Sequence, residues 1–458
     1  MSGLPLADPC ISFWQQTTRA YPYLNHNAKE PVPRASQYVI VGSGISGALT
    51  AFKLIEGGVP GSDIVILEAR EAASGASSRN AGHVRPDAFR GFRVYKDLHD
   101  EEQALKVIAS ERAVFHAVDD FVKEHNVPCD FNPTTTFEVC LTREFADHNA
   151  ESIKEFQRAG GDVSHIKFYS GEEARKKTGV PKALCAYEWP AGSAHPAKLA
   201  QWLLAQSIAK GASFFTHCPA TSVTEGPSGA EGKLWAVQTP RGTITTSTVI
   251  HCTNAFATHL LPQLSSLVTP ERAQAHAFVP PAALASQNVL RSTMSLRHGL
   301  KHFYSVSQRQ SDGTIILGAA LASPNISEAA QLERQTINDR VFNNEVRDDS
   351  VANFQDCFPD CEPEKLSHGE GLQHAWTGII GMTPDLVPFI GKVDGSPGQW
   401  VCARFNGHGM ARIFLCAPGL VKMILGGSWK DTGLPECFEA STRRLEKLRK
   451  QAALLPKL

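Results

Sequence analysis

The residues best suited to chemistry lie near the start of the chain, in a glycine-rich turn between two apolar runs. The turn is Gly42-Ser43-Gly44-Ile45-Ser46-Gly47. In such a GxGxxG turn Gly42 allows the tight bend, Gly44 lets a diphosphate approach the backbone, and Gly47 lets the following helix pack closely. The free N–H groups at the start of that helix favour phosphate. The turn therefore predicts a dinucleotide site.

Three elements must position this turn. Residues 38–41 are apolar and β-branched, which predicts a strand buried on both faces. A periodic apolar pattern from residue 45 predicts a helix that ends at Gly57-Gly58, and residues 64–67 predict a second strand. Glu68 follows that strand, about 20 residues past the last glycine, where an acid accepts hydrogen bonds from ribose hydroxyls. The acid disfavours a cofactor with a 2′-phosphate on that ribose.

The stretch after Glu68 separates FAD from NAD. Residues 71–85 are small, polar and basic, and they lack the hydrophobic period of the helix expected in an NAD-binding unit. An extended loop here would place Arg79 and Asn80 within reach of phosphate or flavin groups. A plain surface loop would have a similar composition, but the position beside the ribose acid favours the cofactor.

Glu68-Ala69-Arg70 and the residues that follow resemble a known superfamily of flavoproteins. The second stretch is Ser74-Gly75-Ala76-Ser77-Ser78-Arg79-Asn80-Ala81-Gly82. It is similar to the glycine oxidase, sarcosine oxidase and D-amino-acid oxidase superfamily, nearest to its γ-glutamylputrescine oxidase-like and related fungal members. The resemblance implies that both stretches contact FAD.

Further motifs follow in the family's order, and the resemblance spans about residues 36–428. Residues 220–223 resemble the strand whose valine, here Val223, receives the adenine. Residues 249–256 resemble a turn near the flavin and imply contacts from Thr253 and Asn254. The turn that closes over the isoalloxazine ring is matched by Asn406, Gly407, His408, Gly409 and Met410.

Cofactor motifs at both ends and in the middle of the chain predict a discontinuous, Rossmann-like α/β domain. It then comprises residues 1–105, 185–260 and 369–458, and the inserts 106–184 and 261–368 form the substrate domain. Residues 136–141 and 313–318 are typical of strands, so we expect an α+β insert with an antiparallel sheet. Residues 101–125 have helical spacing, which predicts a packing helix without a chemical role.

The resemblance implies that flavin N5 takes a hydride from the carbon beside a neutral nitrogen in a small amine or amino acid, giving an imine. We expect His83 near the flavin and Arg85 as the anion anchor. His408 lies within the flavin turn. Trp376 and Tyr304 are candidates to line the substrate cavity, although each residue type also occurs in ordinary packing.

Three positions depart from sarcosine oxidase-like enzymes. Met410 and Ala411 follow Gly409, where those enzymes have a carboxylate-binding lysine. The carboxylate clamp is therefore lost unless Arg412, Arg85 or Arg90 substitutes for that lysine. This shifts the expected substrate towards an amine or a larger N-substituted compound.

The second departure concerns the flavin tether. Gly378 stands near the place of the tethering cysteine, and the nearest preceding cysteine is Cys361, so we expect non-covalent FAD. The third concerns dioxygen. Residues 315–318 lack the lysine that promotes reaction with dioxygen, a role left to His83, His408 or Lys301.

Composition excludes several other classes. The 45 basic and 46 acidic residues nearly cancel, which gives no case for nucleic acid or an anionic membrane as partner. The 11 cysteines are an odd, scattered set without metal-ligand spacing, which favours a reducing compartment and predicts no metal.

The ends and apolar runs of the chain bear on its location. No secretory signal and no apolar run long enough for a membrane span are present. We expect a cytoplasmic protein. The C-terminal Pro456-Lys457-Leu458 differs by one residue from a peroxisomal signal, which gives weak support for that organelle.

Four functions stay open. The first is an oxidase that passes electrons to dioxygen and makes hydrogen peroxide. The second is a dehydrogenase with another acceptor, and the third is a biosynthetic enzyme that oxidises a C–N bond in a larger natural product. The last is a non-enzymatic nucleotide-binding protein, which the retained flavin turn disfavours.

Overall fold

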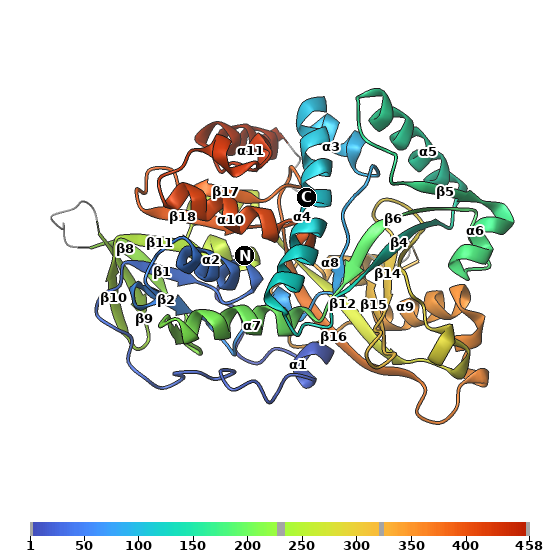
Figure 1. Cartoon of the computed structure of the whole chain (residues 1–458), viewed down its shortest axis with the longest axis horizontal. Coiled ribbons are helices and arrows are strands. Elements are labelled where there is room, and N and C mark those ends of the chain that lie inside the picture. The colour runs from blue at the N-terminus through green and yellow to red at the C-terminus, as the bar shows by residue number, and fades with distance from the viewer. Residues whose placement is uncertain (1–2, 227–233, 320–324, 455–458) are drawn as a thin grey trace.

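The computed structural model describes residues 3–226, 234–319 and 325–454, and its elements form two halves (Figure 1). One half is built on a mainly parallel sheet and the other on a large, mainly antiparallel sheet. Elements from the beginning, middle and end of the chain lie together in the first half. The predicted fold class, α/β with an inserted antiparallel sheet, is confirmed.

The first half centres on a six-stranded sheet in the order β17-β18-β11-β1-β2-β7. The strands are β1 (Tyr38–Val41), β2 (Ile64–Leu67), β7 (Ser213–Phe215), β11 (Thr248–His251), β17 (Phe389–Lys392) and β18 (Gln399–Ala403). All neighbouring pairs are parallel except β17 with β18. Every residue of β1 and β2 is buried, because layers cover both faces of the sheet.

Side chains alternate between the two covering layers. Ile40 and Ile66 pack against the helices α2 (Ile45–Glu56), α7 (Pro196–Ala209) and α10 (Ile413–Ile424). Val39 and Val65 point the other way. There they meet a small antiparallel sheet of β8 (Ser222–Glu225), β9 (Trp235–Thr239) and β10 (Gly242–Thr246). Helix α11 (Thr442–Leu454) lies at the outer edge, beside β17 and β18 (Figure 1).

The second half is a nine-stranded sheet in the order β16-β12-β15-β14-β13-β4-β6-β3, with β5 also on β6. The strands are β3 (His83–Val84), β4 (Asn132–Cys140), β5 (Lys167–Ser170), β6 (Cys185–Ser193), β12 (Thr269–Val279), β13 (Thr293–Arg297), β14 (Phe303–Gln308), β15 (Ile315–Ala319) and β16 (Gly371–Met382). The pairing is antiparallel except between β13 and β4. The two strands expected at residues 136–141 and 313–318 are confirmed as β4 and β15.

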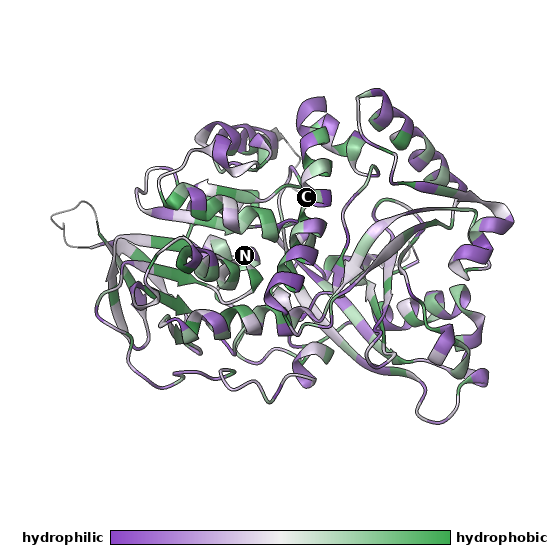
Figure 2. Cartoon of the chain, viewed as in Figure 1, coloured by the Kyte–Doolittle hydropathy of each residue, from purple (hydrophilic) through white to green (hydrophobic). Residues whose placement is uncertain are grey.

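Helices cover the outer face of this sheet. They include α6 (Gly171–Thr178), α8 (Glu328–Leu332) and α9 (Asn344–Cys357). α5 (Arg143–Arg158) follows β4 and packs beside α3 (Phe92–Leu98). Figure 2 shows hydrophobic residues gathered in the central strands, whereas α5 and α11 carry many hydrophilic residues. On the inner face, Ile316 and Trp376 pack in one cluster with Ala197 of α7, so this face meets the first half.

Helix α4 (Glu101–His125) coincides with the helix predicted at residues 101–125. Asp100 caps its N-terminus by accepting a hydrogen bond from the Gln103 N–H, and Asn126 ends it in the left-handed conformation. It packs against α10 and α3 and stands between the two halves (Figure 1). This place at the junction brings one of its acids into the site described below.

The residue ranges proposed for the two domains stay a prediction. β3, β6 and β16 lie in ranges that we assigned to the cofactor domain, yet they pair within the large sheet. Conversely, most of α4 falls in a range assigned to the substrate domain, yet Phe121 on α4 contacts Phe52 of α2 and Phe414 of α10. By these contacts, β3, β6 and β16 would belong to the substrate domain and α4 to the cofactor domain.

Within the described ranges, no helix is both long and apolar enough to cross a bilayer. The possible peroxisomal signal at residues 456–458 lies outside the described residues.

Candidate cofactor and substrate site

The glycine turn after β1 has the steric properties expected of a dinucleotide cradle. Gly42 has φ of +106°, and a Cβ there would lie 2.7 Å from the Cys252 carbonyl oxygen. A Cβ on Gly47 would lie 1.9 Å from the Gly42 carbonyl oxygen, so α2 can approach β1 only with glycine at that position. Gly44 is the N-cap of α2, and the Ile45 N–H donates to the Ser77 hydroxyl over 2.8 Å.

Glu68 organises the turn and still has room for a ligand. One carboxylate oxygen accepts from the N–H and hydroxyl of Ser43, and the other accepts from the Arg70 N–H over 3.0 Å. The Ser43 hydroxyl in turn accepts from the Ala73 N–H. A carboxylate has about four lone-pair sites, so at least one is left for a ribose hydroxyl. The residues therefore fit the adenosine end of FAD.

The loop of residues 70–82 is held by internal bonds. The Ser78 hydroxyl donates to the Ala73 carbonyl, and the Asn80 side chain accepts from the Gly82 N–H over 2.8 Å. The Arg79 guanidinium donates to the carbonyls of Ser74, Thr377 and Cys10. Burial lowers the Arg79 pKa, while neighbouring Asp339 opposes that shift. This geometry favours a loop-positioning role for Arg79 over the predicted phosphate contact.

Arg70 has a similar role. Its guanidinium pairs with Asp339 over 2.8 Å and is almost completely buried. The remaining predicted contacts of this loop, Ser74, Ala81 and Gly82, lie along the same backbone path. Val223 lies half-buried on β8, in the small antiparallel sheet that covers one face of the parallel sheet.

The flavin turn is built by two asparagines. The Asn254 side chain accepts from the backbone N–H groups of Arg404 and Phe405, and the Asn406 side chain accepts from the Thr383 N–H over 2.7 Å. Gly407 is exposed, with φ of +77°. These bonds fix the exit of β18 before α10, at the carboxyl edge where parallel sheets bind ligands.

Two buried polar groups at this edge lack protein partners. The Thr253 hydroxyl follows β11, and the Arg404 guanidinium follows β18. Arg404 is fully buried, no acid among the described residues pairs with it, and burial lowers its pKa to about 9. A buried cation without an acceptor is costly. Both groups fit a cofactor that brings hydrogen-bond acceptors and negative charge.

A cluster of charges occupies the junction between the two halves. At its centre the buried Glu138 of β4 contacts Arg85 and lies 3.1 Å from Arg297 and 3.7 Å from Arg90. Burial alone would raise the Glu138 pKa, but Arg297, Arg85 and Arg90 together lower it to about 2. Burial and Arg90 lower the Arg297 pKa to about 9. One carboxylate is thus shared by three guanidinium groups.

A second buried acid joins the cluster to the flavin turn. Glu111 of α4 lies 3.2 Å from His408 Nδ1, and its Oε1 accepts from Arg412 Nε over 2.9 Å. Its other oxygen accepts from the Asp87 N–H. Burial would raise the Glu111 pKa, but His408 and Arg412 lower it to about 2. We expected α4 to be a packing helix without a chemical role. That expectation stays a prediction, but Glu111 places one side chain of α4 in contact with the flavin turn.

The cluster has a surplus of positive charge. Arg412 also donates to the Tyr95 hydroxyl, and Arg90 pairs with Asp87 over 2.9 Å. We define the junction cluster as Arg85, Arg90, Arg297, Arg412, Asp87, Glu111 and Glu138. Four guanidinium groups therefore face three carboxylates. His83 borders the cluster on β3. Burial and Arg85 lower its pKa to about 3, and both its ring nitrogens lack partners.

The structure does not bring Trp376 and Tyr304 to this cluster. Trp376 Nε1 donates to the Arg79 carbonyl, and its ring packs under the N-terminal segment with Phe13 and Trp14. The Tyr304 hydroxyl donates to Asp349 of α9, on the outer face of the large sheet. The residues that sequence reasoning missed are Glu111, Glu138 and Arg297, each isolated in its own segment.

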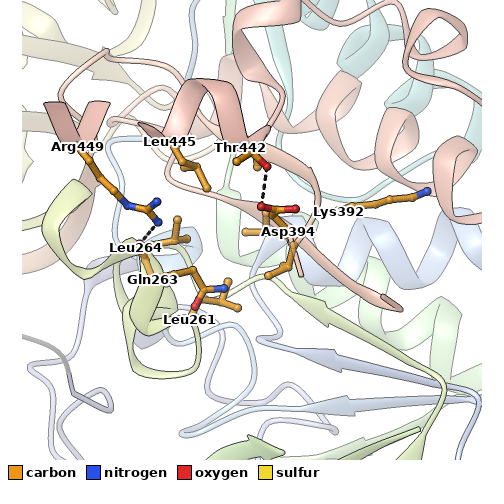
Figure 3. A pocket seen from close by; sticks show the side chains of 11 residues that line it. Leu261, Gln263, Leu264, Lys392, Asp394, Thr442, Leu445 and Arg449 are labelled. Carbon is orange, nitrogen blue, oxygen red and sulfur yellow. Dashed lines mark hydrogen bonds between the residues drawn. The ribbon is translucent and has the colours of Figure 1, made fainter. Parts of the chain in front are cut away.

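A separate pocket lies away from both sites. It has a volume of about 110 Å³ and is enclosed by β17, β18, α11 and residues 261–264 (Figure 3). Two of its polar side chains are engaged with other lining residues, since Thr442 donates to Asp394 and Arg449 donates to the Gln263 carbonyl. Among the described residues, no group of three or more His, Cys, Asp or Glu side chains could hold a metal ion.

Comparison with known proteins decides the family. A family model described as FAD dependent oxidoreductase (DAO) matches residues 37–423. The chain belongs to this family. FAD is the family's cofactor, and this FAD-dependent oxidoreductase carries the cradle and flavin turn described above. No curated protein matches the chain.

Solved structures share its fold. L-proline dehydrogenase from P. horikoshii is 18% identical, with a TM-score of 0.67 over 89% of this chain and 97% of that one. L-amino acid deaminase from Proteus myxofaciens in complex with anthranilate is 16% identical, with a TM-score of 0.67 over 96% and 97% of the two chains. Glycine oxidase from Bacillus cereus ATCC 14579 is 16% identical, with a TM-score of 0.65 over 85% and 95%.

The shared carboxylate predicts how stability depends on pH. The folded-state pKa of Glu138 lies near 2, below an unfolded value of about 4.3. Its stabilisation is therefore complete above the unfolded pKa and is lost as the pH falls towards 2. The free energy of unfolding can be measured with denaturant between pH 7 and pH 2. Glu138→Gln should lower it by roughly 3 kcal/mol at pH 7. Below pH 5 the unfolding free energy of this variant should depend less on pH than that of the parent.

The matched control is Glu155→Gln, which alters the exposed pair of Glu155 with Arg93. That change should alter stability by less than about 1 kcal/mol. A Glu138→Gln variant as stable as this control would contradict the account of the cluster.

We expect Arg404→Met to weaken FAD binding without lowering the stability of the FAD-free protein. Removal of a buried, unpartnered charge should leave the FAD-free protein equally stable or more stable, whereas the dissociation constant for FAD should rise about tenfold or more. Flavin fluorescence titration and thermal unfolding measure the two effects. Lys392→Met, at an exposed cation, is the control. Unchanged FAD affinity would show that Arg404 does not serve the cofactor.

Proposed function

We propose that this FAD-dependent oxidoreductase oxidises a C–N bond in a small amine or N-substituted amino acid, and that the substrate carries an acidic group. The supporting observation is the positive surplus of the junction cluster. A buried surplus cation is stabilised by an anion. A carboxylate on the substrate would supply that anion at the place where the large sheet meets the flavin turn.

FAD, when bound, supplies the hydride acceptor, and the resulting imine is hydrolysed by water. The residues of the chain favour the reactive form of the amine. The surplus positive charge disfavours an ammonium group, so it promotes the neutral amine with its lone pair. His83 is neutral over the physiological range because its pKa lies near 3. Its unpartnered ring nitrogens can therefore orient the substrate without adding repulsion.

Dioxygen is the proposed electron acceptor, with hydrogen peroxide as the product. One observation favours a dehydrogenase with another acceptor as the second candidate. Strand β15 presents Ile316 to the inner side, fully buried against Trp376, where related enzymes would have a lysine. Lys301 is exposed in the turn before β14. The cations available to promote reduction of dioxygen are then Arg404 and those of the junction cluster.

The test of function is the visible spectrum of the FAD-loaded protein under anaerobic conditions. We expect N-substituted amino acids to bleach the flavin bands, and matched amines that lack the acidic group to bleach them far less. Rapid return of colour in air supports an oxidase, and slow return supports a dehydrogenase. A flavin that none of these substrates bleaches would overturn the proposed function while leaving the cofactor in place.

Arg85→Met should raise KM for an acidic substrate about tenfold to a hundredfold, because a charge-assisted contact is lost. Steady-state kinetics with the acidic substrate and its matched amine measure the effect. The KM for the amine should change little, and so should the FAD content. An equal loss for both substrates would contradict the role of Arg85 as anion anchor.

FAD should be held without a covalent bond. Gly378 occupies the position expected for a tethering cysteine, and Cys361 packs in the outer core beneath α9. Acid precipitation should release all of the flavin into the supernatant, as measured by its absorbance. Yellow colour retained in the washed precipitate would contradict this expectation.

A further inference from the structure

The first part of the chain runs outside the glycine-rich unit, and its sequence shows no motif for a ligand. In the structure it follows the outer side of the cofactor loop. We define the N-terminal clasp as residues 3–24 and the cofactor loop as residues 70–82. Figure 1 shows this segment, with α1 (Phe13–Gln16), passing below α7 towards β16. Its contacts go to three different parts of the molecule.

The first contacts bind two carbonyls of the cofactor loop. The Ser12 hydroxyl donates to the Ser78 carbonyl over 2.5 Å, and Trp14 Nε1 donates to the Asn80 carbonyl over 2.7 Å. Ser12 and Trp14 are almost completely buried. Both bonds end on the backbone of the loop, so they fix its path whatever side chains it carries.

In a second set of contacts, Cys10 of the clasp bonds to Arg79 and Asp339. The Cys10 carbonyl accepts from Arg79 over 2.7 Å, and the Cys10 N–H donates to the Asp339 carbonyl over 2.9 Å. Cys10 Sγ also lies 3.4 Å from the Thr377 hydroxyl on β16. The clasp therefore connects the cofactor loop with the large sheet.

A third set holds the clasp itself in place. Thr17 bonds to His195, the N-cap of α7, and the Tyr21 hydroxyl donates to the Gln201 carbonyl. The Trp14 and His195 rings lie 4.7 Å apart. These contacts attach the clasp to α7.

Trp14 controls the direction of one peptide group at the cofactor side. In a trans peptide the C=O and the next N–H point in opposite directions. The Asn80 carbonyl points to Trp14, so the Ala81 N–H points away from the clasp. Ala81 itself lies beside β14 and β15, since the Ser307 hydroxyl donates to the Ala81 carbonyl and a Cβ on Gly318 would lie 2.9 Å from the Ala81 Cβ.

From these contacts we infer that the N-terminal clasp retains FAD, by holding the cofactor loop against the start of α2. The other side of the loop carries Ser77, whose hydroxyl accepts from the Ile45 N–H at the N-terminus of α2. Release of the clasp would let residues 77–81 move away from the diphosphate and flavin positions. The clasp acts on the cofactor through the loop, so its residues are positioning residues.

The test is the combined variant Ser12→Ala, Trp14→Phe, which removes both hydrogen bonds and keeps an aromatic ring in the core. Each bond contributes on the order of 1 kcal/mol, so the dissociation constant for FAD should rise at least tenfold. Flavin fluorescence during titration of the FAD-free protein measures this constant. The flavin absorption bands of the loaded variant should shift, since the Ala81 N–H is reoriented.

Gln16→Ala is the matched control, because it removes an exposed side chain of the clasp that lies 3.4 Å from His374 and leaves the bonds to the loop and to α7 intact. Its FAD affinity should stay within about twofold of the parent. Circular dichroism of the FAD-free variants checks that they are folded. If the combined variant is unfolded, Trp14→Phe alone carries the test, with an expected rise of about fivefold.

FAD affinity of the folded variant within twofold of the parent would overturn the inference. The readout involves no substrate, so this outcome is independent of the proposed C–N oxidation.

Discussion

The structure depends on two buried carboxylates that hold arginines at the junction of its two halves. Glu138 comes from the large sheet and Glu111 from α4, and between them they contact Arg85, Arg90, Arg297 and Arg412. Isolated ions at these positions would be too costly, so each acid must keep its partners in one geometry. The loop after β3, the flavin turn and the sheet are thereby fixed relative to one another. The same network leaves one positive charge in excess. In the proposed function, this charge binds the acidic group of the substrate.

On the cofactor side, the shape of the site is set mainly by the backbone and not by charged side chains. At positions 42 and 47 only glycine fits, because a Cβ there would clash with the backbone. The Glu68 carboxylate is held in place by hydrogen bonds from Ser43 and Arg70 without a bound ribose. Arginines in the cofactor loop turn outwards to Asp339 and to carbonyls. The positive charge at the carboxyl edge of the parallel sheet comes instead from Arg404, at the exit of β18.

Local patterns in the sequence were sufficient to predict the cradle, the long helix α4 and the strands β4 and β15, because each depends on residues close together in the chain. The choice of strand face was not predictable in the same way. Both faces of the large sheet are covered, so Tyr304 finds buried neighbours on whichever face it takes. Trp376 does lie on the inner face, against Ile316 and the Arg79 carbonyl, but away from the junction cluster. Period-2 alternation then cannot tell the inner face from the outer one. Glu111 and Glu138 were missed because a single acid in a helix or strand resembles a solvated residue until its distant arginines are known.

Binding of a small carboxylate that cannot be oxidised, such as acetate or benzoate, tests the central claim most directly. The FAD-loaded protein would be titrated with it while the flavin absorption bands are followed. The account predicts a saturable spectral shift for the parent, much weaker binding for Arg85→Met, and no shift with a neutral amide of the same shape. Equal responses to the carboxylate and the amide would show that the positive surplus of the junction cluster does not select an acidic substrate beside the flavin.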